Sequence, residues 1–526
     1  MSKAEKYILT LWFISNLLIG LFIVRDFGVS YDEPEYYVYA QNSVDAYRSF
    51  FALAYVPVFG PHDLPNYGPA FILFPELATR FLKMTFPNIF AADVWHFSYF
   101  LLFQLGGLCL YSLARRWFNS WSAWGVLLLY ISQPLLWGHA FINPKDIPFM
   151  AFFLFTVWSG LRLADSLGAE NIDVSFPRVK SLSFPRFRVR ESLPFLRSPQ
   201  LILAGGLLGM TISIRLLGPL SGLIVILYLA FTLRQKSLPV ITAYLICAAV
   251  VMFLTWPYLW PDPVGHWMDS LVLMARFPWP GHVLFNRQFH EAESLPIAYL
   301  PKLLNIQLTE SLLFLLYLGF AALVFSLARK RLKLDLFLVL VLGALLPLTG
   351  LILSRATMYD NFRQILFLLP PLILLAGLAV DLIFSVLKSV VFRLAVLIVL
   401  ALPGVYGIIQ LHPYPYVYYN SLVGGTGGAF RNFEIDYWCT SYREAALWLN
   451  ANAPQNAKIG GDGPTDLLYV YLRSDLQRTK QTGEDYDYFV IPSRYNQDLN
   501  LYPEAKVIYS VERKGAVLAV IKQPSP

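Results

Sequence analysis

The sequence predicts an α-helical polytopic membrane protein, for three reasons. Of its 526 residues, 56% are hydrophobic and only 14% are charged, whereas a soluble domain carries about 25% charged residues. The apolar residues gather in runs of about 17–23, the length of a helix that crosses a bilayer. The short segments between these runs carry many of the basic residues, as the cytoplasmic loops of membrane proteins do.

Eleven apolar runs are predicted to cross the membrane. The fifth and sixth form one stretch that Arg215, Gly218 and Pro219 interrupt, and counting two spans there puts the basic loops on one side. Lys3 and Lys6 make that side the cytoplasm. The first run lacks a small-residue cleavage site, so it is expected to be a retained span. The runs are 7–24, 94–113, 121–138, 147–163, 200–216, 217–233, 238–259, 310–328, 334–353, 362–384 and 393–410.

The net charge of +7 does not predict nucleic-acid binding, because the basic residues lie in short loops between apolar runs. Cys109, Cys247 and Cys439 form neither a disulfide framework nor a zinc-binding spacing. His282 and His290 also lack a third ligand at metal-binding spacing. A divalent metal ion is therefore left open, and no other cofactor is predicted.

Two long segments, 25–93 and 260–309, are predicted on the outer face. The first contains the amphipathic stretches 37–55 and 67–84, which are expected to form helices along the membrane surface. The insert 178–197 is rich in proline, arginine and serine. It is predicted to be poorly ordered on the cytoplasmic side, in contact with anionic lipid.

Two domains are expected, a transmembrane domain at 1–410 and a small soluble α/β domain at 411–526 on the outer face. In the second, "SYREAALWLNAN" and "PTDLLYVYLRS" predict helices. The segment "AKIGGDG" predicts a strand or turn, and "YDYFVIPS" predicts a strand. The segment "KVIYSVERKGAVLAVIKQ" predicts a hairpin with Lys514 and Gly515 at its turn.

The unusual ionisable side chains are predicted at or beyond the outer ends of the spans. Such side chains are costly near membrane depth, so they are functional candidates by default. Several basic side chains close to acids indicate a phosphate ester on a lipid as the substrate. The candidates are Asp32, Glu33, Lys145, Asp146, Arg215, His282, Arg355 and Arg363.

Asp32 and Glu33 have a structural and a functional interpretation. Asp32 precedes Pro34 and suits a helix N-cap, while Ser30 and Glu33 have the spacing of a capping box. Alternatively, a carboxylate held rigidly at the membrane face serves as general base toward a hydroxyl or amine. The two interpretations are compatible, because a cap fixes the carboxylate in place.

The other candidates also have two interpretations. In "NPKDIPF", Asp146 suits a helix N-cap, with Lys145 reaching the lipid headgroups. In the functional interpretation Asp146 is a second acid and Lys145 is a phosphate ligand. Arg215 suits an interfacial anchor, whereas Arg355 and Arg363 match the charge and shape of a lipid phosphate. The many aromatic rings of the outer loops suit the aromatic belt, although such rings also pack on sugar faces and isoprenoid chains.

The segment "YDEPEYY" resembles the first outer loop of the GT-C superfamily of membrane glycosyltransferases, in the branch of protein O-mannosyltransferases and lipid A aminoarabinose transferases. That loop reads Asp-Glu-x-x-Tyr, which is Asp32, Glu33 and Tyr36 here. Asp146 resembles a second aspartate of that branch, and the layout of spans and outer loops is similar along the whole chain. The C-terminal segment differs from the external domains of the mannosyltransferases, which leaves the sugar and the acceptor open.

The resemblance implies an inverting enzyme that transfers a hexosyl or pentosyl group from a polyprenyl-phosphate donor at the outer face of a bacterial inner membrane. The acceptor would be a hydroxyl or amine of a protein, lipid or glycan. Asp32 is implied as the base, with Glu33 or Asp146 orienting the acceptor or tuning that base. The expected donor-phosphate ligands are Lys145, Arg215, Arg363 and Arg355, and the expected pocket residues are Tyr36, His282 and Tyr359.

Two other classes of function are open alternatives. A transporter or flippase of a lipid-linked saccharide would share the cationic groove and the aromatic rings. Such proteins commonly carry paired repeats and charges near the bilayer midplane, and this sequence shows neither pattern. A non-catalytic membrane scaffold would act through partners of its outer domain.

Overall fold

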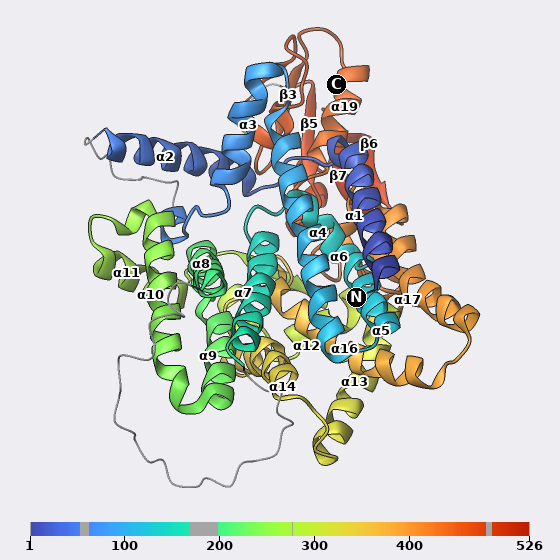
Figure 1. The fold of residues 1–526 in the computed structure, drawn as a ribbon. Helices are drawn as coiled ribbons and strands as arrows, with labels where there is room; N and C mark the ends of the chain where they lie inside the picture. Colours follow the sequence, from blue (N-terminus) through green and yellow to red (C-terminus); the bar gives the residue numbers. More distant parts are fainter. Residues whose placement is uncertain (1, 53–62, 169–197, 276, 480–485, 525–526) are drawn as a thin grey trace.

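The computed structural model describes residues 2–52, 63–168, 198–275, 277–479 and 486–524. It is a bundle of long helices with a small sheet at one end (Figure 1). The predicted insert at 178–197 lies outside the described residues, as does the last part of the predicted helix at 37–55.

Every predicted span coincides with a helix or with consecutive helices. A 59° bend separates α5 from α6, and a π-helical segment, Val341–Leu345, joins α14 to α15. The helices are α1 (Lys3–Ile23), α4 (Ala91–Trp117), α5 (Ser120–Ile131), α6 (Pro134–Ile142), α7 (Asp146–Ser166), α8 (Pro199–Ile214), α9 (Pro219–Leu233), α10 (Ser237–Thr255), α13 (Glu310–Ala328), α14 (Leu334–Leu340), α15 (Leu346–Ser354), α16 (Leu369–Val386) and α17 (Val390–Leu411).

The chain is an integral membrane protein. Among the described residues, eight helices are long and apolar enough to cross a membrane, or nine if α5 and α6 form one broken span. That count treats Pro219–Thr255 as one span, although a φ of +50° at Arg234 separates α9 from α10. It leaves out α8, which has only 16 residues. The total of eleven crossings therefore stays a prediction.

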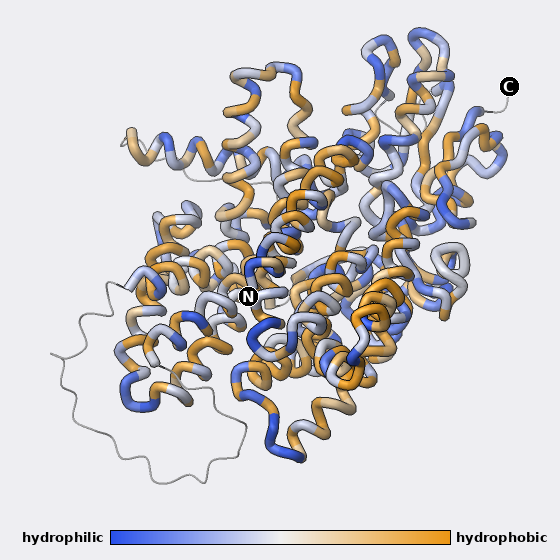
Figure 2. Tube along the Cα trace, turned by 45° about the vertical axis from the view of Figure 1, so that its right-hand side comes forward, coloured by the Kyte–Doolittle hydropathy of each residue, from blue (hydrophilic) through white to orange (hydrophobic). Residues whose placement is uncertain are grey.

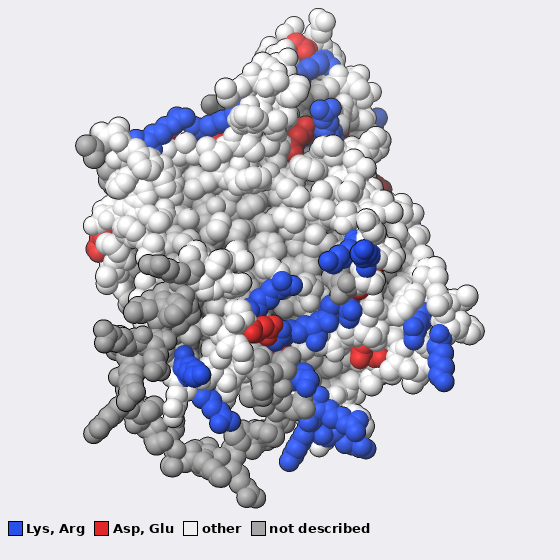
Figure 3. Space-filling model, viewed as in Figure 1, with Lys and Arg blue, Asp and Glu red and all other residues white. Residues whose placement is uncertain are grey.

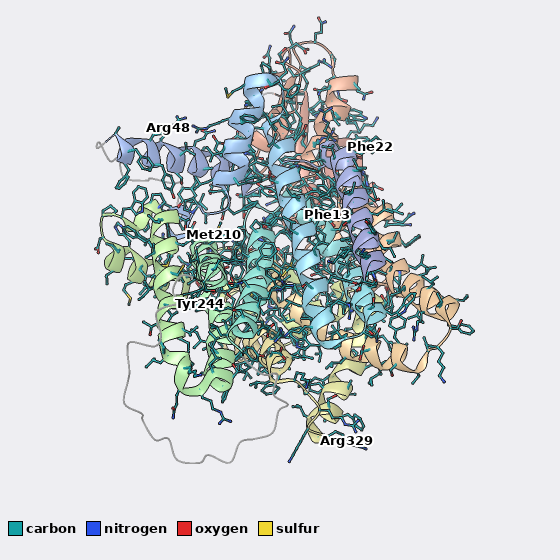
Figure 4. The ribbon with its side chains drawn as sticks, viewed as in Figure 1. Phe13, Phe22, Arg48, Met210, Tyr244 and Arg329 are labelled. Atoms are coloured by element: carbon teal, nitrogen blue, oxygen red, sulfur yellow. The ribbon has the colours of Figure 1, made fainter. Side chains whose placement is uncertain are left out.

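The bundle has a buried centre and an apolar outer surface. The most hydrophobic windows of α7 and α16 are each 83% buried, whereas that of α1 is 11% buried. Hydrophobic residues run along the long helices (Figure 2), and Phe22 of α1 is 88% exposed (Figure 4). Lipid is the environment that suits such a surface.

Charged residues gather at the two ends of the molecule. On the face shown in Figure 3, a broad uncharged belt separates the two groups. Arg48 of α2 and Arg329 after α13 lie at opposite ends (Figure 4). The α9–α10, α13–α14 and α16–α17 connections lie at the end opposite the sheet (Figure 1). These three predicted basic loops therefore share one end, and its cytoplasmic location stays a prediction.

The two long loops form short elements at the end of the bundle that carries the sheet. Two surface helices were predicted in the first loop, and two helices are found there. The second loop contains an antiparallel hairpin that was not predicted, with Asn286 and Arg287 in the left-handed region at its turn. These elements are α2 (Glu33–Phe51), α3 (Leu73–Thr85), α11 (Pro263–Ala275), β1 (His282–Phe285), β2 (Gln288–Glu291) and α12 (Tyr299–Gln307).

The C-terminal unit, from α19 to β7, contains a five-stranded mixed sheet. Its strand order is β4-β3-β5-β7-β6, with β3 parallel to both neighbours and the other pairs antiparallel. The predicted hairpin is confirmed, with Lys514 and Gly515 in the left-handed region at its turn. The elements are α18 (Gly425–Ala429), which precedes the unit, α19 (Tyr442–Asn452), β3 (Lys458–Gly461), α20 (Asp466–Tyr469), β4 (Gln477–Arg478), β5 (Tyr488–Pro492), α21 (Gln497–Asn500), β6 (Lys506–Arg513) and β7 (Ala516–Gln523).

The helix predicted over 464–474 is wrong beyond Tyr469, because α20 spans only four residues. Arg473 explains part of the difference. Its guanidinium donates to the backbone carbonyls of Asn450 and Ala453 at the end of α19. These tertiary hydrogen bonds hold the segment in a turn that local helix propensity does not reveal.

Candidate active site

A cavity of about 430 Å³ lies where the helix bundle meets the C-terminal unit. The start of α2, the turn before α7 and the segment before α16 contribute to its walls from the bundle. The C-terminal unit contributes Asp462, Arg494 and Tyr495. Five of the predicted site residues line it, namely Asp32, Tyr36, Lys145, Tyr359 and Arg363.

Asp32 faces this cavity and does not cap the helix that follows it. Its backbone is in the right-handed helical region, and its side chain makes no capping hydrogen bond, so the predicted N-cap is wrong. An N-cap residue has extended backbone angles, which bring its side chain over the first turn. The carboxylate instead lies 3.4 Å from Nη2 of Arg363, with a quarter of the side chain exposed. Burial raises the pKa of Asp32, although Arg363 and Lys145 lower it.

Glu33 points away from the cavity and anchors the start of α2. Its carboxylate accepts hydrogen bonds from the backbone N–H of Ser30 at 2.7 Å and from the hydroxyl of Tyr37 at 3.1 Å. It also lies 3.0 Å from Nε2 of His96 on α4, and both side chains are fully buried. Only half of the predicted capping box forms, because the Ser30 hydroxyl donates to the carbonyl of Ile142. Glu33 therefore fixes the loop that carries Asp32.

Arg363 is the centre of the charged cluster on the cavity wall. The side chain is 4% exposed. Its Nε lies 3.0 Å from Asp360, its Nη1 lies 3.3 Å from Asp146, and its Nη2 reaches Asp32. The guanidinium also lies over the rings of Tyr359 and Trp438. Three carboxylates and two rings thus hold one cation in a fixed orientation.

Asp146 lies behind Arg363, with no surface in the cavity lining. One carboxylate oxygen is 2.5 Å from Nη1 of Arg215, and the other accepts from the amide of Asn143 at 3.1 Å. Asp146 is the first residue of α7 and does not cap it. Asn143 takes that role, because its amide oxygen accepts from the backbone N–H groups of Lys145 and Asp146. Asp146 and Arg215 therefore position Arg363.

Lys145 differs from the arginines because it faces the cavity with no ion-pair partner within the described residues. Its Nζ lies 4.2 Å from the centre of the Tyr67 ring and 5.8 Å from that of Tyr36. Burial, together with the charges of Arg215 and Arg363, lowers the pKa of Lys145 to about 8 against the opposing effect of Asp146. An ammonium group in this position can accept an anionic ligand.

Sequence reasoning missed several residues of this cavity, and two of them are charged and central. Asp360 bridges Arg363 and Arg494, whose Nη2 lies 2.6 Å from its second oxygen. Trp279 stacks on Tyr359, with ring centres 4.5 Å apart and planes 7° apart. The spacing of Asp360 and Arg363 in "YDNFR" was a usable signal. Arg494 follows a buried strand of a different unit, so no local pattern links it to them.

Two predicted site residues lie away from the cavity. His282 begins strand β1, and its side chain is exposed. Arg355 follows α15 in a left-handed conformation and lines a separate small pocket with Leu295 and Met358. Their positions give no support to the predicted roles in phosphate binding or in the substrate pocket.

The carboxylates of the charged cluster around Arg363 are not arranged as a metal site. Asp32, Asp146 and Asp360 all pair with arginine. In the described part of the chain, no group of three or more His, Cys, Asp or Glu side chains is placed to hold a metal ion. This donor set does not fit a divalent ion, so no step below is assigned to one.

Comparison with solved structures identifies the fold. ArnT from Cupriavidus metallidurans in the apo state is 15% identical to this chain in sequence. The match covers 99% of this chain and 98% of the ArnT chain, with a TM-score of 0.50. The same protein bound to undecaprenyl phosphate is 13% identical, covers 97% of each chain and has a TM-score of 0.47. The oligosaccharyltransferase AglB from Archaeoglobus fulgidus, in complex with an inhibitory peptide and a dolichol-phosphate, is 15% identical. It covers 92% of this chain and 62% of its own, with a TM-score of 0.44.

No protein-family model and no curated protein sequence matches the chain. The similarity to ArnT extends over nearly the whole of both chains, and at this level of identity it describes the fold. The motif at Asp32 predicted that fold from the sequence. The chain has the fold of ArnT from Cupriavidus metallidurans.

Proposed function

We propose that this protein is an inverting glycosyltransferase that moves a sugar from a polyprenyl-phosphate donor to an acceptor hydroxyl or amine. One observation carries the proposal. The carboxylate of Asp32 and the ammonium of Lys145 face the same cavity. The first has no helix-capping role, and the second has no ion-pair partner among the described residues. A base and a phosphate ligand are the two groups that this reaction needs.

Lys145 adds a positive charge beside a cluster of paired acids and arginines. Three carboxylates and three guanidinium groups form one connected cluster, and Lys145 adds one further positive charge beside it. A sugar linked to a lipid through one phosphate carries one negative charge, which can pair with the ammonium of Lys145. The cluster consists of Asp32, Asp146, Asp360, Arg215, Arg363 and Arg494.

In the proposed reaction, the acceptor attacks the anomeric carbon while Asp32 removes its proton. The bond between that carbon and the phosphate oxygen breaks, and its electron pair stays on the lipid phosphate. The leaving phosphate gains negative charge, which Lys145 and Arg363 stabilise at fixed positions. A raised pKa of Asp32, caused by burial, makes its carboxylate a better proton acceptor.

The stacked rings of Trp279 and Tyr359 are the proposed binding surface for the sugar of the donor. Both residues line the cavity, and an aromatic face packs against the C–H face of a sugar ring. The identity of the sugar and of the acceptor is open. The proposed location is the outer face of a bacterial inner membrane, with the N-terminus in the cytoplasm.

A transfer assay in proteoliposomes tests the proposal. Wild-type protein is given a panel of labelled polyprenyl-phosphate sugars, and sugar transfer and the release of lipid phosphate are measured. Asp32→Asn is the test variant, and Asp26→Asn is the matched control, because Asp26 pairs with His412 outside the cavity lining. Transfer by wild type and the control but not by Asp32→Asn supports the enzyme.

The same assay separates the alternatives. Movement of the intact donor across the bilayer with no loss of sugar would indicate a flippase. Binding with neither transfer nor movement, equal in all three proteins, would indicate a scaffold. The placement of the cavity at the end of the bundle, beside the C-terminal unit, favours the enzyme over a transporter with a midplane site.

A further inference from the structure

We infer that the C-terminal unit completes the active site through Arg494, a positioning residue that acts on the membrane-embedded part through Asp360. The inference rests on the proposed function. It gives the C-terminal unit an indirect part in holding the lipid phosphate, through Asp360 and Arg363.

Two buried ion pairs in series connect the C-terminal unit to the phosphate ligand. Nη2 of Arg494 lies 2.6 Å from Oδ1 of Asp360, and Oδ2 of Asp360 lies 3.0 Å from Nε of Arg363. The side chains of Asp360, Arg363 and Arg494 are 5%, 4% and 13% exposed. In a buried site of this kind, the position of one charge depends strongly on its partners.

Arg494 is itself held by contacts other than Asp360. Its Nη1 donates to the carbonyl of Tyr437 at 2.7 Å, and its guanidinium lies 5.0 Å from the centre of the Tyr495 ring. It lies two residues after β5, which ends at Pro492, and it opens a short 3-10 helix, Arg494–Asn496, that precedes α21. The strand end therefore presents a fixed guanidinium fork to Asp360.

The backbone at Asp360 also depends on its neighbours. Asp360 and Asn361 both adopt positive φ values, 52° and 59°, a region that Asp and Asn enter more readily than other residues with a Cβ. The carbonyl of Asn361 accepts from the Tyr299 hydroxyl at 3.1 Å, and its side-chain oxygen accepts from Tyr419 at 3.3 Å. The Arg494–Asp360 ion pair adds to the contacts that hold this turn in place.

Arg494 could instead act alone, because it too lines the cavity and could touch a ligand directly. A double-mutant cycle separates the two possibilities. If Arg494 works through Asp360, removing Asp360 leaves it nothing to act on. If Arg494 contacts the ligand itself, the losses from the two substitutions multiply.

The test is the affinity of the full chain in detergent for undecaprenyl phosphate, measured for wild type, Arg494→Gln, Asp360→Asn and the double variant. We expect each single variant to bind about tenfold more weakly, and the double variant to bind within about twofold of Asp360→Asn. Arg513→Gln is the matched control, because it breaks a 2.7 Å ion pair with Glu444 elsewhere in the unit. The control should bind as wild type does.

Two results overturn the inference alone. The first is an Arg494→Gln variant that binds undecaprenyl phosphate as tightly as wild type does. The second is a double variant in which the two losses of affinity multiply to about a hundredfold. If the wild type does not bind undecaprenyl phosphate at all, the proposed function fails and this inference fails with it. If Arg494→Gln does not fold, Arg494→Lys replaces it in the cycle, because lysine keeps the positive charge but lacks the forked guanidinium. The affinity of the double variant is then compared with that of Asp360→Asn in the same way.

Discussion

Nη2 of Arg363 lies 3.4 Å from Oδ2 of Asp32, at the wall of a cavity that the C-terminal unit helps to form. This pair joins the two functions that the proposed reaction requires. The arginine favours the ionised form of the acid, against the effect of burial, and orients its carboxylate. When a phosphate binds, the guanidinium can donate some of its hydrogen bonds to the phosphate in place of Asp32. The carboxylate is then free to take a proton.

The pH dependence of transfer should be bell-shaped. Activity should rise with pH as Asp32 loses its proton, at a pKa above the ordinary value for aspartate because of burial. It should fall as Lys145 loses its proton, at a pKa of about 8. The sign follows because the base must be deprotonated, whereas the phosphate ligand must be charged. The measurement is kcat/KM against pH.

A substitution at Lys145 checks the origin of the alkaline limb. Lys145→Arg keeps a positive charge far above pH 8, so the fall near pH 8 should disappear or move upward. Lys145→Gln should weaken donor binding by about tenfold or more, since it removes a charge from a site of low exposure. An alkaline limb that is unchanged in Lys145→Arg would contradict this role for Lys145.

Glu33→Gln should damage the fold more than the chemistry. The substitution leaves His96 buried without its carboxylate partner, and the loss of one member of a buried pair costs about 3 kcal/mol. Thermal unfolding in detergent should show the destabilisation. At a temperature where the variant is folded, its pH profile should keep both limbs of the wild-type profile. A normal melting temperature with no transfer would instead make Glu33 a catalytic acid.

Arg363 and Arg355 should behave differently, although the sequence offers both as phosphate ligands. Arg363→Gln removes the partner of three carboxylates, so binding of undecaprenyl phosphate should fall by about tenfold or more. Arg355→Gln and His282→Asn change residues outside the cavity lining, and binding should stay within about twofold of wild type. A large loss in either control would show that the site extends beyond the cavity described.

Stability should depend on pH through Glu434. Burial raises the pKa of Glu434 to about 8, from an ordinary value of 4.5. Between these values the unfolded chain releases the proton and the folded chain keeps it, so folding becomes less favourable as pH rises. The melting temperature of wild type should therefore fall relative to that of Glu434→Gln between about pH 5 and about pH 8. A constant difference between the two proteins would contradict a raised pKa.

The helices could be predicted because bilayer length and hydropathy leave little choice for runs such as 310–328, which matches α13 residue for residue. Chain reversal at Lys514 and Gly515 was also predictable, since a Gly-containing turn between alternating strands is a local signal. Local patterns were weaker for Tyr471 and Arg473, where tertiary hydrogen bonds replace the predicted helix.

The site was predictable only in part. Asp32, Lys145 and Arg363 were found because each stands out near the end of an apolar run. The role of Asp32 was harder to predict, because an aspartate that caps a helix and one that acts as a base occur in the same sequence pattern. Only the backbone angles of Asp32 in the structure exclude the cap. Asp360 and Arg494 lie 134 positions apart, and their pairing depends on how the C-terminal unit sits on the bundle.

The role of Asp32 as the base is the central claim, and one comparison tests it most directly. Transfer and the binding of undecaprenyl phosphate are measured together for wild type and Asp32→Asn. We predict that Asp32→Asn binds the lipid phosphate at least as well as wild type, because a negative charge is removed, and that transfer falls by a factor of about 100 to 10,000. Transfer by Asp32→Asn at the wild-type rate, with the same binding, would contradict the claim.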